Sequence, residues 1–203
     1  MIQATWTHLL ARALVRPLVG TGITPNHLTT LRLLSGLAAC GALALGTRTG
    51  DWWGGGLWLL STFLDRADGE LARVGNMMSE AGHRYDFVVD NLVTAAFFVA
   101  IGIGLHESWL GAWSVPLGLA AGACLLLCNW WSERLEVRTG RVTRAYSGRW
   151  GFDLDDLLYL MGPLAWLGWL APILVGAAFG TAIMAAITGV RLRRLPQKIA
   201  GEA

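Results

Sequence analysis

Charged residues are scarce in this sequence, and cysteines are few. Asp, Glu, Lys and Arg make up 15% of the 203 residues, whereas hydrophobic residues make up 54% and the mean hydropathy is +0.48. This balance excludes an ordinary soluble domain, in which about a quarter of the residues are charged. The three cysteines, Cys40, Cys124 and Cys128, all lie in apolar stretches. The sequence therefore lacks the disulfide pattern of a small secreted protein, and its cysteines are typical of packing residues.

The apolar residues fall into six stretches, which predict an all-α, polytopic membrane protein that forms one domain, 1–203. A helix needs about 20 residues to cross the ~30 Å hydrocarbon layer. Arg32 lies one turn inside the first stretch, and we expect its side chain to extend to the nearby membrane surface. The predicted six-helix bundle covers 28–190, with transmembrane helices at about 28–46, 52–65, 90–105, 113–131, 157–170 and a sixth at 173–190.

The first segment, 2–19, mixes apolar and basic residues and is too charged to cross a membrane. Leucines alternate in it with His8, Arg12 and Arg16. This pattern predicts an amphipathic helix that lies on the membrane surface. No uninterrupted apolar run with a small-residue cleavage site follows the basic residues, so a cleavable signal peptide is not expected.

Four aspartates lie between two apolar stretches. Burying a carboxylate in a bilayer costs free energy, so four in one place indicate a function. Their spacings, i to i+3 and i to i+4, place each pair on one face of a helix. Between the pairs, Gly75 and Asn76 are typical of a helix end, and Ser79 is typical of a helix start. The segment therefore predicts an antiparallel helical hairpin that brings together Asp65, Asp68, Asp86 and Asp90.

Four neighbouring carboxylates cannot all be ionised without a compensating charge. Hard divalent cations with oxygen ligands supply that charge most often, so we predict a site for Mg²⁺ or Mn²⁺, with two ions. An alternative is a buried ion-pair network in which Arg66 and Arg84 neutralise the aspartates.

The segment 65–90 also resembles a known family. Its residues Asp65-x2-Asp68-Gly69-x2-Ala72-Arg73-x8-Gly82-x3-Asp86-x3-Asp90 are similar to the complete signature of the CDP-alcohol phosphotransferases, integral membrane enzymes of phospholipid synthesis. The resemblance implies that a hydroxyl attacks the phosphorus of a CDP-linked alcohol and that CMP is released. It also implies a homodimer.

The resemblance assigns roles to the signature residues. Asp65, Asp68, Asp86 and Asp90 all correspond to metal ligands, and Asp90 also corresponds to the general base close to the second metal. Contacts with the cytidine diphosphate fall on Gly69, Ala72, Arg73 and Gly82. Gly69 and Ala72 lack bulk and allow the nucleotide to approach the helix backbone, and Arg73 offers several donors to phosphate.

Outside the signature, Asn26 follows Pro25 at a place where related enzymes also carry Pro-Asn near the nucleotide. The same dipeptide is an ordinary turn signal. His83, beside Gly82, is a candidate for ligand contact, but a histidine at a helix start that faces water is more common. The arginine-rich loop 133–151 predicts either contact with anionic lipids or a pocket for a phosphate on the acceptor. Its candidate acceptor-binding residues are Arg134, Arg138, Arg141 and Arg144, and the acidic residues that follow are Asp153, Asp155 and Asp156.

Basic residues also predict the orientation. With six crossings, all of the 16 Lys and Arg residues except Arg48 fall on one side, which also holds both termini and the aspartates. By the positive-inside rule, we expect that side to face the cytoplasm at the inner membrane. Gly118 and Gly122 form a GxxxG pattern, which is compatible with a dimer contact or with packing inside the chain.

Two other functions are compatible with acidic residues in a membrane. One is a cation-coupled transporter, although no inverted repeat is visible in the sequence. The other is a metal-dependent phosphatase that hydrolyses CDP-diacylglycerol. The expected partners are a CDP-linked lipid or alcohol, an acceptor alcohol and membrane lipids, with no nucleic acid. The acceptor remains open, as does whether the donor is CDP-diacylglycerol or a CDP-linked small alcohol.

Overall fold

The computed structural model of the chain describes residues 6–139 and 154–194, and these residues form only helices and connections. The prediction of an all-α fold is therefore confirmed. The α-helices are α1 (Trp6–Val15), α2 (Pro25–Ala44), α3 (Arg48–Val74), α4 (Glu80–Gly104), α5 (Ser114–Thr139), α6 (Met161–Trp166) and α7 (Leu170–Arg194). Three short 3-10 helices accompany them, η1 (Arg16–Leu18), η2 (Gly111–Trp113) and η3 (Leu154–Leu160).

Helix α2 begins where its local sequence favours a start. Pro25 occupies the first turn, where the missing N–H costs nothing. The backbone N–H of Thr24 donates to His27 Nδ1 at 3.2 Å, and the Thr24 side chain accepts from the backbone N–H of His27. This reciprocal cap fixes the start of α2, and with it the position of Asn26 in the first turn.

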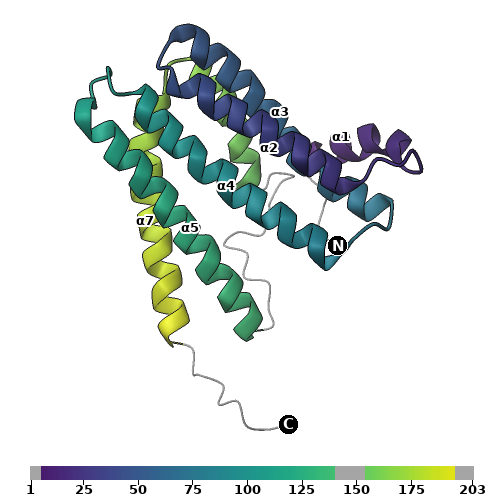
Figure 1. Cartoon of the computed structure of the whole chain (residues 1–203). Helices are drawn as coiled ribbons and strands as arrows, with labels where there is room; N and C mark the ends of the chain where they lie inside the picture. Colours follow the sequence, from purple (N-terminus) through teal and green to yellow (C-terminus); the bar gives the residue numbers. More distant parts are fainter. Residues whose placement is uncertain (1–5, 140–153, 195–203) are drawn as a thin grey trace.

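The long helices form a bundle in which α2 packs against both α3 and α4, and α5 packs against α4 and α7 (Figure 1). Helix α6 covers α3, and α1 lies against the end of α3 that is closest to the 75–79 turn (Figure 1). The ring of Trp58 on α3 stacks on Phe97 of α4, with 3.7 Å between the ring centroids. This aromatic contact joins α3 and α4 within the main hydrophobic core.

Four described segments are long and apolar enough to cross a membrane: α2, α4, residues 111–139 and α7. Helix α3 has 27 residues, but acidic and basic residues interrupt its apolar character. The predicted fifth helix, 157–170, is not continuous. It consists of η3 and the six-residue α6, and Gly168 with φ +74° separates it from α7. Glycine adopts this left-handed conformation without the steric cost of a Cβ atom, so the chain can turn there.

The two glycines of the GxxxG pattern pack inside the chain. A Cβ atom at Gly118 would lie 2.5 Å from the carbonyl oxygen of Phe98, and one at Gly122 would lie 3.1 Å from that of Ala95. Both contacts are with α4, so the absent side chains allow the backbones of α4 and α5 to approach closely. The structure thus favours packing inside the chain over a dimer contact for this pair.

Candidate active site

The predicted hairpin is present. Helix α3 ends at Val74, and Asn76 adopts a positive φ of 52°, a conformation that Asn tolerates better than most residues. Ser79 then caps α4, because its side chain accepts a hydrogen bond from the backbone N–H of Gly82 at 3.1 Å. The local signals read from the sequence thus join α3 and α4 through a short turn, and α2 packs against both helices.

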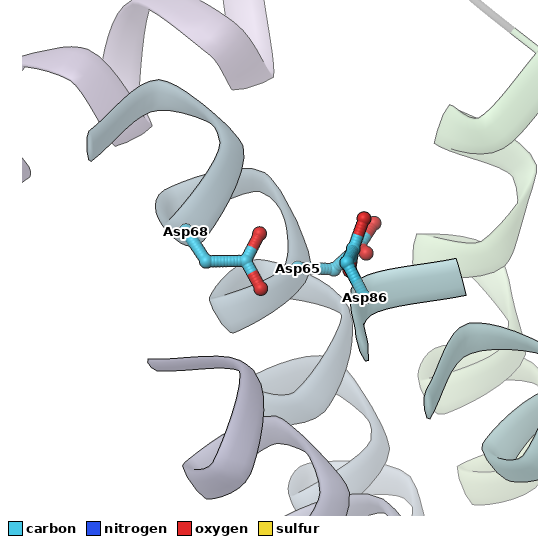
Figure 2. A group of neighbouring side chains, drawn as sticks. All are labelled: Asp65, Asp68 and Asp86. Carbon is cyan, nitrogen blue, oxygen red and sulfur yellow. The ribbon is translucent and has the colours of Figure 1, made fainter. Parts of the chain in front are cut away.

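Three of the four aspartates converge on one point. Each of Asp65, Asp68 and Asp86 offers a carboxylate oxygen, and these oxygens lie within 4.8 Å of one another. Figure 2 shows Asp68 pointing from α3 toward the other two side chains. Asp68 is buried, whereas Asp65 and Asp86 are partly exposed, so the group has an open side. The donor set consists of hard oxygens, and its spacing fits a Mg²⁺ or Mn²⁺ ion.

Asp90 joins this group through Arg32. Its Oδ1 accepts from Arg32 Nη2 at 2.6 Å, and the Thr94 hydroxyl lies 3.5 Å from the same oxygen. The predicted convergence of four carboxylates is therefore found for three, and Asp90 is not one of them. Its side chain is 41% exposed, so a substrate hydroxyl can reach it.

Arg32 is the main correction to the sequence analysis. Its side chain does not extend to the membrane surface but is 4% exposed, and its Nη1 lies 2.6 Å from Asp65 and 3.2 Å from Asp86. Of the two arginines in the ion-pair alternative, Arg84 is wrong, because it pairs with Glu80 at 3.3 Å on the exposed surface. The signal was visible, because an arginine one turn inside an apolar stretch calls for a partner.

Two guanidinium groups, those of Arg32 and of Arg66, whose charge also acts on Asp65, cannot neutralise four carboxylates. The contacts of Arg32 involve only the Oδ1 atom of each aspartate that it touches. Asp68 instead accepts a hydrogen bond from the hydroxyl of Thr29 at 2.7 Å, a contact that the sequence analysis missed. Negative charge remains in excess among these groups, and a bound cation would balance it.

A cavity of about 480 Å³ opens beside the acidic group and is bordered by Asp68 and Asp86. Its wall contains all five residues that the sequence analysis assigned to the nucleotide: Asn26, Gly69, Ala72, Arg73 and Gly82. Asn26 comes from α2, so three helices build the cavity. A Cβ atom at Gly82 would lie 3.3 Å from Asn26 Oδ1, which shows how closely α2 and α4 approach at the rim.

The cavity also has residues that the sequence analysis did not assign to it. Met77, Met78 and Ser79 line it from the turn between α3 and α4. His83 lines it as well and is exposed, so it can contact both water and a ligand in the cavity. The spacing of residues in the sequence did not predict that this turn borders a cavity, because the cavity forms only where α2 packs against α3 and α4.

The candidate acceptor arginines lie elsewhere or outside the described residues. The guanidinium of Arg134 stacks on the ring of Trp130, 3.8 Å from its centroid, and Arg138 is exposed near the end of α5. Neither residue lines the 480 Å³ cavity. Arg141, Arg144 and Asp153 lie outside the described residues, as do the side chains of Asp155 and Asp156.

Comparisons with known proteins agree with this geometry. A family model described as CDP-alcohol phosphatidyltransferase matches residues 22–190. Two crystal structures of Mycobacterium tuberculosis phosphatidylinositol phosphate synthase, PgsA1, have a similar fold, each with a TM-score of 0.67 and 20% sequence identity. The structure with CDP-DAG bound aligns over 98% of both chains. The structure with manganese and citrate aligns over 97% of this chain and 93% of that chain.

A curated relative is similar over a shorter stretch. The bifunctional IPC transferase and DIPP synthase of Aquifex aeolicus (strain VF5) is 34% identical over 95 residues, or 47% of this chain. The matched stretch spans 21% of that relative's length.

Proposed function

From the premise that the chain belongs to the CDP-alcohol phosphatidyltransferase family, and is a multi-pass membrane enzyme of that family, we propose its reaction. It transfers a phosphatidyl group from CDP-diacylglycerol to the hydroxyl of an acceptor and releases CMP. One observation carries the proposal: a single cavity joins the acidic group to all five residues expected at the nucleotide.

The cavity wall suits a nucleotide diphosphate. Gly69 and Ala72 present little more than backbone, so a flat or extended ligand can lie close to α3. Arg73 adds a guanidinium with several N–H donors, which match phosphate oxygens. The CDP-DAG bound to PgsA1 supports the choice of donor, since the two folds align over nearly their whole length.

Asp65, Asp68 and Asp86 would hold the divalent cations, and Asp90 lies beside them. Bound cations neutralise phosphate charge and make the phosphorus more electrophilic. The manganese in a PgsA1 structure supports this assignment. Thr29 and Arg32 fix the directions of the carboxylates by hydrogen bonds, so the ligand set is held in place before an ion binds.

Asp90 would act as the general base. Arg32 Nη2 holds one of its oxygens at 2.6 Å, which orients the carboxylate at the edge of the acidic group. The acceptor O–H proton passes to Asp90 while the acceptor oxygen forms a bond to the phosphorus next to the lipid. The bond from that phosphorus to the oxygen of CMP breaks, and CMP leaves with the electron pair.

We propose six membrane crossings, with α3 as the second and residues 154–166 as a short fifth. Helix α3 is about 40 Å long at 1.5 Å per residue, enough to cross the hydrocarbon layer and extend beyond it. In this topology the 75–79 turn and the acidic group face the cytoplasm, and exposed Trp109 lies at the opposite surface. Single cysteines at Met78 and Trp109, in a variant without native cysteines, should react with an impermeant thiol reagent from opposite sides.

The acceptor is proposed to carry a phosphate, which Arg134, Arg138, Arg141 and Arg144 would bind. The support is the charge of the segment and the likeness to a synthase of phosphatidylinositol phosphate.

We also propose a homodimer. Because Gly118 and Gly122 pack against α4, the dimer contact would involve other residues. Chemical crosslinking in native membranes tests it.

The test of function is CMP release by purified protein from CDP-diacylglycerol with Mg²⁺ or Mn²⁺. Candidate acceptors are glycerol 3-phosphate, an inositol phosphate and serine, each compared with water alone. CMP release that requires one acceptor supports the transferase. Equal release with water alone supports a phosphatase instead, and cation uptake into liposomes without CMP release supports a transporter. CMP release only from a CDP-linked small alcohol with a lipid acceptor would show that the lipid is the acceptor and not part of the donor.

A further inference from the structure

Glu70 is a buried acid outside the cluster of aspartates. It follows Gly69 on α3, and its side chain is 2% exposed. Its Oε1 lies 2.9 Å from His8 Nδ1 and accepts from Arg73 Nη2 at 2.7 Å, while its Oε2 accepts from Arg12 Nε at 2.9 Å. A buried carboxylate needs such partners, because the cost of removing it from water is otherwise uncompensated.

Two of these partners belong to α1, which has two distinct faces. His8 and Arg12 are four residues apart and therefore project from the same side of the helix toward Glu70. Ala11 and Val15 are buried on this side of the helix, whereas His8 and Arg12 are partly exposed. The leucines of α1 point elsewhere and are 48–56% exposed: Leu9, Leu10 and Leu14. This helix can thus lie on the membrane surface through its leucines while its other face is fixed to α3.

The third partner, Arg73, lines the 480 Å³ cavity. A Cβ atom at Gly69 would lie 3.4 Å from Arg73 Nη2 and 3.6 Å from Nη1, so the guanidinium folds back across Gly69. Its side chain is 47% exposed, and its other N–H groups can reach a ligand in the cavity. The position of this guanidinium therefore depends on Glu70.

We propose that Glu70 is a positioning residue, which holds Arg73 for the diphosphate of the donor, and that α1 makes this possible. Arg12 shares the charge of Glu70, and His8, whose Nε2 accepts from Arg66, donates its Nδ1–H to the same carboxylate. Without them, Glu70 would attract Arg73 more strongly and compete with the diphosphate for the same donors. The seating of α1 on α3 thus controls donor affinity from outside the cavity. This inference rests on the proposed function, since it assigns Arg73 to the diphosphate.

The test measures KM for CDP-diacylglycerol, KM for the acceptor and kcat in three variants of the full chain. These are Glu70→Gln, the double variant His8→Gln/Arg12→Gln, and the control Glu107→Gln, whose side chain is 98% exposed. Loss of a charged hydrogen bond predicts a rise of about tenfold in donor KM for the first two. Acceptor KM should stay within about twofold, and the control should match the wild type.

A double-mutant cycle separates positioning from a general structural role. If Glu70 acts through Arg73, then adding Glu70→Gln to Arg73→Gln should cause no further rise in donor KM. A multiplicative effect would overturn the proposal, and so would a wild-type donor KM in the His8→Gln/Arg12→Gln variant. The latter variant keeps the test valid if Glu70→Gln does not fold. A wild-type protein that releases no CMP would refute the proposed function instead.

Discussion

Helix α3 carries two acidic sites with opposite charge balance. On one side, Asp65 and Asp68 face α2 and α4. There Arg32 contacts three of the four carboxylates. Two residues further along the helix, Glu70 has two arginines, Arg12 and Arg73, and the ring of His8 as partners. Side chains of the protein thus supply all the hydrogen bonds and the compensating charge for Glu70, whereas the aspartates keep an excess of negative charge.

This difference separates a site for ligands from a structural contact. A carboxylate whose partners are all supplied by the chain is held in one position and has little affinity left for an ion. Carboxylates that converge with too little positive charge are costly unless an ion binds, so folding and ion binding become coupled. The comparison predicts that variants of the two sites respond differently to divalent cations.

The largest effect is expected for Asp90→Asn. The amide cannot accept the proton of the acceptor, so CMP release should fall by about a thousandfold. The binding of CDP, measured by calorimetry with Mn²⁺, should remain within about threefold, because Asp90 does not line the cavity. Wild-type turnover in this variant would remove Asp90 as the base.

Asp65→Ala should weaken the binding of Mn²⁺ by at least about tenfold and weaken CDP binding with it, because one of three converging ligands is lost. Electron paramagnetic resonance of free Mn²⁺ gives the affinity. The control is Asp51→Asn in the first turn of the same helix, far from the acidic group. Unchanged Mn²⁺ affinity in Asp65→Ala would exclude Asp65 as a ligand.

Arg32→Gln should make the protein depend on divalent cations for its stability. Without ions, the pairs between buried Arg32 and the partly exposed aspartates are lost, and the free energy of unfolding should fall by about 3 kcal/mol. Mn²⁺ should then raise Tm more than it does in the wild type, because the ion replaces the lost charge. In Glu70→Gln, Mn²⁺ should raise Tm only as in the wild type. Equal increases in all three proteins would contradict the distinction between the two sites.

A smaller effect is expected at the cavity rim. A Cβ atom at Gly82 would lie 3.0 Å from Ser79 Oγ and 3.3 Å from Asn26 Oδ1, so Gly82→Ala should displace the wall of the cavity. We expect donor KM to rise about fivefold with little change in kcat, equivalent to about 1 kcal/mol. Gly176→Ala on α7 is the control, because nothing lies within 4 Å of its Cβ position.

Local patterns predicted the hairpin and its acidic group. Gly75, Asn76 and Ser79 ended one helix and capped the next, and helical spacing then placed the aspartates on facing sides. These features depend on residues near each other in the sequence. The same reasoning failed for residues 157–170, because a break at Gly168 is set by a positive φ that hydrophobicity does not reveal.

Contacts over long sequence distances were beyond such patterns. Arg32 meets Asp86 across 54 residues, and His8 meets Glu70 across 62. The sequence pattern therefore predicted Arg32 at the membrane surface and predicted His8 and Arg12 on a basic face that lies on that surface. Each assignment depended on which helix packs where, and that packing depends on side-chain shape along whole helices.

By itself, the sequence determined the helical membrane class, the acidic hairpin and the set of small residues beside it, since each follows from composition or from spacing within one or two turns. Only the tertiary structure decided that Arg32 lies among the aspartates, that Asn26 completes the cavity wall, and that α1 is fixed to Glu70. The physical reason is that a charge in an apolar stretch requires a partner, while the identity of the partner depends on packing between distant segments.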